Sequence, residues 1–107
     1  MKLMVAIVND RDAKAVNNAL VQFGFRITRL ASTGGFLRRG NTTFLIGVKD
    51  REVGTVVDLL KETARERPVM VPAGWGDSFE ESVGEMVEVK EGGATIFVVP
   101  VEEMYRV

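Results

Sequence analysis

The alternation of strand-like and helix-like segments is the feature of this sequence that most restricts its fold. Residues 2–9 form a run rich in valine and isoleucine that ends at Asn9, a residue that often caps the start of a helix. The next apolar residues recur at helical spacing as Val16, Leu20 and Phe23, and this stripe stops at Gly24. The first quarter of the chain therefore predicts one strand followed by one amphipathic helix.

The rest of the chain predicts a hairpin and then a second helix and strand. Residues 25–31 and 43–48 are strand-like and flank a Thr-Gly-Gly break at 33–35, so we expect them to pair as an antiparallel hairpin. A second helical stripe begins at Val53 and stops before Pro68, and residues 94–99 are again strand-like. The order strand, helix, strand, strand, helix, strand predicts a ferredoxin-like βαββαβ sandwich of the α+β class. We expect residues 1–107 to form a single domain.

The segment between the second helix and the last strand has no clear period. Residues 68–84 contain two prolines, three glycines and Trp75, the only tryptophan, and this composition predicts a long surface loop. Residues 86–90 are strand-like. We expect them to form an extra strand that pairs with residues 94–99 as a hairpin across Gly92 and Gly93.

Composition excludes several classes of function. The 14 basic and 15 acidic residues leave a net charge of −1, so we expect neither a nucleic-acid polymer nor an anionic membrane as a partner. Histidine and cysteine are both absent, which removes imidazole and thiolate metal sites and the commonest catalytic bases and nucleophiles. We therefore expect no catalytic residues, no metal and no cofactor. The start MKLMVAIVNDRD becomes charged too early for a secretory signal, so a cytoplasmic location is expected.

Two of the expected strands are apolar on both faces. Residues 4–8 and 96–99 do not alternate with polar residues, although both helices of a ferredoxin-like fold cover only one face of the sheet. Burial of a few hundred Å² of apolar surface, at roughly 25 cal/mol per Å², favours association. The sequence therefore predicts a homo-oligomer.

Residues 31–48 hold the side chains best suited to a ligand. Gly35 and Gly47 allow backbone N–H groups to approach a ligand closely, Asn41 offers both a donor and an acceptor, and Phe36 places an apolar ring on a loop. Together these residues fit a nucleotide. The Thr-Gly-Gly segment also fits an ordinary hairpin tip.

The strand before this segment divides its residues between two faces. Phe25 and Ile27 are expected under the helices, so Arg26 and Thr28 should point toward the intersubunit side. A ligand there would contact two chains. By contrast, the charged residues 10–12 and 80–81 are expected to be helix-start and loop charges, not catalytic pairs.

With these elements and candidate residues, the chain resembles the PII-like cyclic di-AMP receptor family of small trimeric signal-binding proteins. The resemblance lies in three strings, KLMVAIVNDRD, FRITRLASTGGFLRRGNTTFLIGV and GGATIFVVPVEE, which together span nearly the whole length. It implies a homotrimer with one cyclic di-AMP in each intersubunit cleft, no catalysis, and loops that change on binding to signal to an unknown downstream protein. It also implies ligand-binding roles for seven residues: Arg26, Thr28, Phe36, Leu37, Asn41, Gly47 and Phe97. With Gly35, which the glycine pattern adds, the predicted ligand residues number eight.

Two other functions remain open at this stage. A PII-type regulator that senses ATP or ADP would need a basic segment to hold a triphosphate, for which Arg38 and Arg39 are the candidates, although they also suit a solvated charge pair. A small trimeric enzyme on the same fold is disfavoured because no acid and base are paired.

Overall fold

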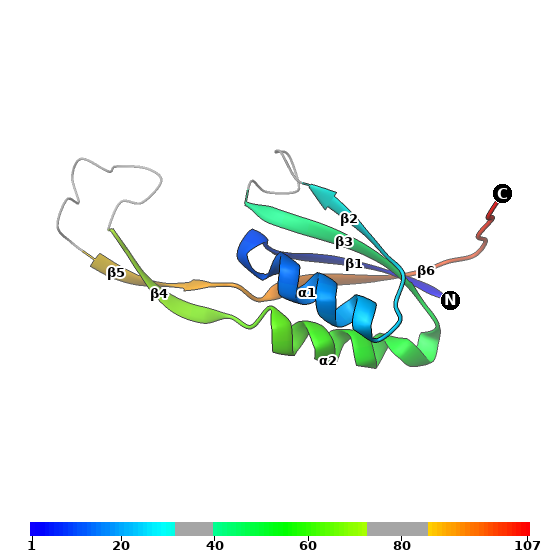
Figure 1. The fold of residues 1–107 in the computed structure, drawn as a ribbon, viewed down its shortest axis with the longest axis horizontal. Helices are drawn as coiled ribbons and strands as arrows, with labels where there is room; N and C mark the ends of the chain where they lie inside the picture. Colours follow the sequence, from blue (N-terminus) through cyan, green and yellow to red (C-terminus); the bar gives the residue numbers. More distant parts are fainter. Residues whose placement is uncertain (32–39, 73–85) are drawn as a thin grey trace.

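The computed structural model describes residues 1–31, 40–72 and 86–107, which form two helices on one face of an antiparallel sheet (Figure 1). The four strands of this sheet lie in the order β2–β3–β1–β6, which confirms the ferredoxin-like α+β fold. Their bounds are β1 Lys2–Asn9, β2 Ile27–Ala31, β3 Asn41–Val48 and β6 Ala94–Pro100. The helices are α1 (Asp10–Gln22) and α2 (Val53–Thr63), the latter preceded by the short 3-10 helix η1 (Asp50–Glu52).

Helix α1 begins where its capping residue predicted. The Asn9 side-chain oxygen accepts a hydrogen bond of 2.9 Å from the backbone N–H of Arg11. The helix ends before Phe23, and Gly24 follows in the left-handed region at φ +84°. The prediction that Phe23 belongs to the buried stripe was wrong: it is 60% exposed, because it has left helical geometry and no longer continues the face of Val16 and Leu20.

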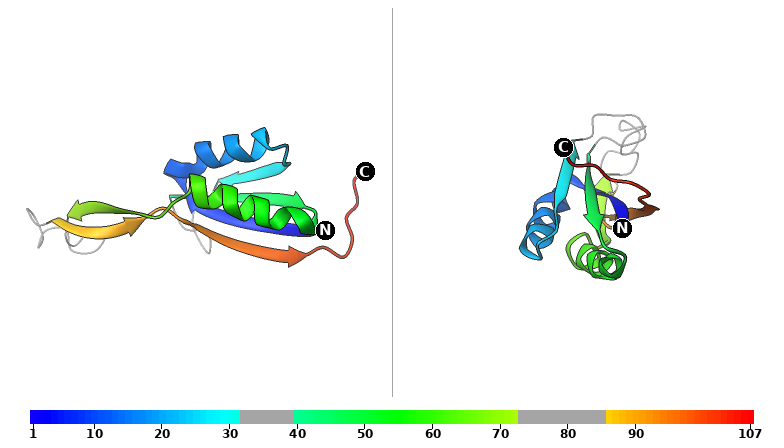
Figure 2. Two further views of the ribbon diagram at one scale, coloured as in Figure 1. Left: turned by 90° about the horizontal axis from the view of Figure 1, so that it is seen from below. Right: turned by 90° about the vertical axis from the view of Figure 1, so that its right-hand side faces the viewer.

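The core lies between the helices and the sheet (Figure 2). Alternate residues of β1 and β3 point into it, and Phe44, Met4 and Leu20 are its largest fully buried side chains. From β2 and the residues before it, Ile27 and Phe25 pack partly buried against this core. The expectation that these two residues lie under the helices is therefore confirmed.

The extra strand has a different partner from the one expected. Strand β5 (Met86–Glu91) pairs antiparallel with β4 (Arg67–Pro72), not with β6, so part of the predicted loop is a strand. The described ends of this β4–β5 hairpin project away from the main sheet (Figures 1 and 2). Gly92 and Gly93 have φ values of +96° and +79° and lead β5 on into β6, whereas we expected them to turn the chain back.

Gly92 also lies against backbone that leaves no room for a side chain. A Cβ atom there would be 2.6 Å from the carbonyl oxygen of Arg65 and 3.0 Å from a guanidinium nitrogen of Arg67. The junction between β5 and β6 therefore lies directly beside the start of β4, the strand with which β5 pairs.

Candidate functional site

The face of the sheet away from the helices carries side chains in rows that cross all four strands. In one row Thr28 of β2 is the partner of Leu45, Leu45 of Val5, and Val5 of Phe97 on β6. Directly paired residues project to the same face, so this row spans the sheet from edge to edge. Thr28 and Phe97 stand at its two ends, about 14 Å apart over three strand spacings.

Apolar side chains dominate the middle of this open face. Leu3, Val5 and Ile7 of β1 are only half-buried, and the neighbouring row contains Leu30, which is 38% exposed. Phe97 at the β6 edge is 44% exposed. The described chain therefore leaves an apolar sheet face partly uncovered, as the doubly apolar strands predicted.

The structure places five of the eight predicted ligand residues on or beside this face. Thr28 and Gly47 are exposed on β2 and β3, Arg26 is exposed just before β2, and Asn41 is half-buried at the start of β3. Phe97 lies on β6, as described above. These residues do not gather around one point of a single chain but lie across the sheet and along its edges.

The other three predicted ligand residues, Gly35, Phe36 and Leu37, lie outside the described residues. Arg38 and Arg39, the candidates for holding ATP or ADP, also lie outside the described residues. So does Trp75, in the predicted long loop.

Arg26 is suited to an anionic ligand. It is exposed, and within the described parts of the chain its guanidinium has no carboxylate partner within ion-pair distance. Arg29 of β2 is the register partner of Phe44, whose side chain is buried on the helix side. Because side chains alternate along a strand, Arg29 lies on the helix side, opposite to Arg26. Arg26, just before β2, and Arg29, within it, therefore carry the same charge toward opposite faces of the sheet.

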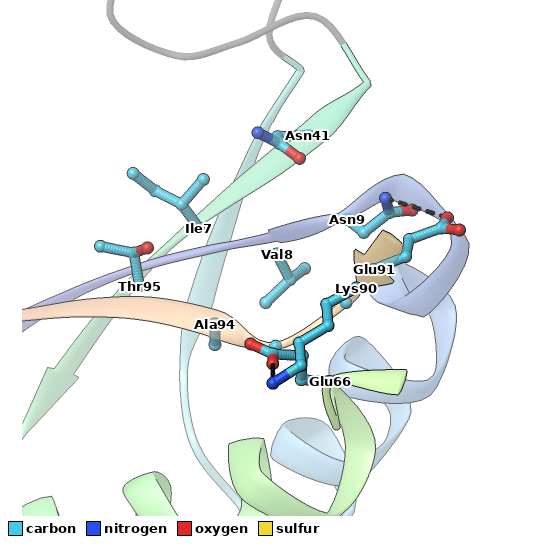
Figure 3. A pocket seen from close by; sticks show the side chains of 11 residues that line it. Ile7, Val8, Asn9, Asn41, Glu66, Lys90, Glu91, Ala94 and Thr95 are labelled. Atoms are coloured by element: carbon cyan, nitrogen blue, oxygen red, sulfur yellow. Dashed lines mark hydrogen bonds and ion pairs between the residues drawn. The ribbon is translucent and has the colours of Figure 1, made fainter. Parts of the chain in front are cut away.

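A cavity of about 430 Å³ lies where β1 ends and β3 begins (Figure 3). Asn41 lines it together with Asn9, its register partner, and with Thr95. The opposite wall belongs to the base of the β4–β5 hairpin, where Lys90 and Glu91 lie. The cavity is therefore shared between the main sheet and the hairpin.

One hydrogen bond and one ion pair lie along this cavity wall. The Asn9 side-chain nitrogen donates to Glu91 Oε1 at 3.4 Å, and Lys90 Nζ lies 3.5 Å from Glu66 Oε1, as Figure 3 shows. The Asn9–Glu91 contact is partly buried, whereas the Lys90–Glu66 pair is exposed. Exposed ion pairs of this kind contribute little to stability.

Sequence reasoning missed two features of this region. The charged residues 10–12 do begin α1, as expected, but they also bind residues that follow them by 30 to 80 positions, described below. Thr43, beside Asn41 on β3, is 1% exposed, and its hydroxyl has no hydrogen-bond partner in the described chain. Neither feature has a local sequence signal, because both depend on packing between distant segments.

Within residues 1–31, 40–72 and 86–107, no cluster of three or more acidic side chains is arranged to hold a metal ion. In the same ranges, neither helix is long and apolar enough to cross a membrane.

Comparison with known proteins gives two findings. The family model described as cyclic-di-AMP receptor matches residues 1–107. A crystal structure of a functionally unknown protein from Pediococcus pentosaceus ATCC 25745 is similar, with a TM-score of 0.74 and 34% sequence identity. That alignment covers 99% of this chain and 96% of the other.

Proposed function

Because the chain belongs to the cyclic di-AMP receptor family, we propose that it binds this nucleotide in clefts between the subunits of a homotrimer, without catalysis. Occupancy is relayed to a protein partner by loop rearrangement. The family match supports the ligand, and the uncovered apolar sheet face supports the assembly.

The observation that carries the proposal is the separation of the predicted ligand residues across the sheet. Thr28 and Phe97 lie at opposite edges of one row, about 14 Å apart, so within one chain they do not face each other. When two copies pack side by side, the β2 edge of one can approach the β6 edge of the next. A cleft at that junction would bring Arg26 and Thr28 of one subunit to Phe97 of its neighbour.

The chemistry of these residues matches the parts of a cyclic dinucleotide. The Arg26 guanidinium and the Thr28 hydroxyl are donors for phosphate oxygens, and a charged donor forms the stronger hydrogen bonds. The Asn41 amide offers the donor and acceptor that an adenine edge requires. Phe36 supplies a ring for base stacking, which contributes roughly 1 to 3 kcal/mol per base in nucleic-acid binding proteins.

The remaining predicted residues shape the cleft. Gly35 and Gly47 allow the backbone to approach the ligand, and Leu37 supplies apolar surface. The segment between β4 and β5 transmits ligand occupancy to the partner. It contains Trp75, the only tryptophan of the sequence, so tryptophan fluorescence reports on that segment alone.

Isothermal titration calorimetry tests the proposal directly. The purified protein should bind cyclic di-AMP more tightly than cyclic di-GMP or ATP, with one nucleotide per subunit. Arg26→Ala should weaken binding by about tenfold or more, since a hydrogen bond to a charged group contributes roughly 1.5 to 3 kcal/mol. Arg29→Ala removes the same charge from the other face of β2 and should bind normally.

Three results would contradict the proposal. Preference for ATP over cyclic di-AMP would favour the PII-type ATP or ADP sensor. Equal loss of affinity in the two arginine variants would mean that charge alone, and not the face of β2, governs binding. Consumption of the nucleotide during the titration would identify an enzyme.

A further inference from the structure

The first turn of α1 binds both strands at the base of the β4–β5 hairpin. Arg11 Nη1 donates to Glu91 Oε1 of β5 at 2.7 Å, and Asp12 Oδ1 accepts from Arg67 Nη1 of β4 at 3.2 Å. Arg67 and Glu91 are themselves register partners. Two ion pairs therefore attach the two strands of the hairpin to consecutive residues of one helix. The helix supplies the cation in one pair and the anion in the other.

These pairs are more protected than ordinary surface charges. The Asp12 side chain is 11% exposed and the Glu91 side chain 23% exposed, although Arg11 itself reaches out to solvent. Arg67 Nη1 also donates to the Arg65 carbonyl oxygen at 3.3 Å, so the same nitrogen has two acceptors. If one partner of such a pair is removed, the remaining charge is solvated less well by water than a charge at an open surface would be.

The same helical turn also holds the start of β3. The backbone N–H of Asp10 donates to the Gly40 carbonyl oxygen at 2.9 Å, and the Thr42 hydroxyl donates to Asp10 Oδ1 at 2.6 Å. These two contacts fall on either side of Asn41, the residue proposed to read adenine. One turn of helix therefore contacts the ligand-binding end of β3 and the base of the hairpin.

Asn9 provides a second connection across the cavity. Its side-chain oxygen accepts from Arg11 N–H, so its nitrogen is left to donate to Glu91. Asn9 is the register partner of Asn41, and both line the cavity whose other wall includes Glu91 and Gly92. A change in the direction of the hairpin would therefore reshape the cavity beside Asn41.

We propose that Asp10, Arg11 and Asp12 are positioning residues that couple the nucleotide site at Asn41 to the direction of the β4–β5 hairpin, an inference that rests on the proposed function. The hairpin has a clamped arrangement, with the contacts described above, and a released arrangement in which it pivots at Gly92 and Gly93. Cyclic di-AMP binds the clamped arrangement more tightly, because only there does Glu91 hold the side chain of Asn9, the register partner of Asn41. A ligand shifts such an equilibrium only through this difference in affinity, and the coupling acts equally in both directions.

The test combines ligand affinity with amide hydrogen exchange on the full-length protein. Cyclic di-AMP should slow exchange in residues 67–72 and 86–91 of the wild type. Arg11→Ala should weaken binding by about fivefold or more, the lower end of typical coupling between sites. At saturating ligand, this variant should no longer show the ligand-dependent change in hairpin exchange, a readout that simple destabilisation would not abolish.

A double-mutant cycle assigns the effect to the ion pair. Glu91→Gln should weaken binding by a similar factor, and the double variant Arg11→Ala/Glu91→Gln should be no weaker than either single variant. Lys14→Ala is the matched control, since Lys14 is an exposed cation one turn further along α1. It should leave both readouts unchanged.

The outcomes separate this inference from the proposed function. No binding of cyclic di-AMP by the wild type would overturn the receptor assignment itself. If the wild type binds but hairpin exchange is unchanged at saturation, or if Arg11→Ala retains wild-type affinity and exchange, the coupling is wrong while the receptor assignment stands. Additive effects of Arg11→Ala and Glu91→Gln would also overturn it.

Discussion

At the scale of single residues, Asn41 allows a direct test of base recognition. Asn41→Ala should weaken cyclic di-AMP binding by about 5- to 150-fold, because a buried group left without its partner costs roughly 1 to 3 kcal/mol. The matched control is Asn18→Ala, an exposed asparagine on α1, which should bind normally. Calorimetry at constant protein concentration measures both, and normal binding by Asn41→Ala would exclude the residue from the site.

Gly92 allows a test of the close backbone approach at the hairpin base. Gly92→Ala should lower the free energy of unfolding by roughly 1 to 3 kcal/mol, since the residue has φ +96° and its new Cβ would meet the Arg65 carbonyl oxygen at 2.6 Å. Gly54→Ala in α2 meets nothing within 4 Å and should be neutral or stabilising by up to about 1 kcal/mol. Urea unfolding at one fixed protein concentration distinguishes the two variants, and equal stability would contradict the geometry described here.

Residues with local signals could be predicted from the sequence, and residues with distant partners could not. The capping role of Asn9 and the face of Phe25 depend on neighbours a few positions away, and both were predicted correctly. The roles of Arg11 and Asp12 depend on Glu91 and Arg67, which are 80 and 55 residues away. An alternation of charges at a helix start is compatible with solvent exposure as well as with these contacts, so the sequence alone cannot distinguish them.

At the scale of elements, the β4–β5 hairpin should be less protected than the main sheet. Its amides should exchange faster than those of β1 and β3, because a two-stranded ribbon with exposed side chains such as Met70 and Met86 has little stability of its own. Strand β1, in contrast, is paired on both sides and covered by the helices. Hydrogen exchange without ligand measures this difference, and equal protection would mean that another chain covers the hairpin.

The partner of β5 is the element-level feature that sequence reasoning assigned wrongly. Residues 86–90 and 94–99 are close in sequence and separated by Gly92 and Gly93, a pattern typical of a hairpin. The real partner, β4, contains Pro68 and Pro72, which weaken any strand prediction. Both prolines are tolerated because β4 is an edge strand of a two-stranded sheet, where half of the backbone N–H groups have no strand partner.

At the scale of the whole molecule, the open face of the sheet predicts association in solution, and the proposed function makes the assembly a trimer. Light scattering should give three times the chain mass of 11.8 kDa. Val5→Glu places a charge in the middle of the open face and should reduce the mass to that of one chain, because an unpaired charge is costly to bury. Loss of cyclic di-AMP binding should accompany dissociation if the site lies between subunits.

The control for this prediction is Thr55→Glu, which adds the same charge at an exposed position on α2. It should remain trimeric and bind normally. A wild-type protein that is monomeric at micromolar concentration, or a monomeric Val5→Glu variant that binds as tightly as the wild type, would rule out an intersubunit site.

The glycine junction between β5 and β6 has a mechanical consequence. Each strand of the hairpin has six residues and extends about 20 Å from the junction, at roughly 3.3 Å per residue. Over that length, a rotation of about 10° at Gly92 and Gly93 displaces the far end by roughly 3 Å, about the length of one hydrogen bond. If the proposed coupling operates, a small rotation beside Asn41 would therefore move the far end of the hairpin far enough for a partner protein to distinguish.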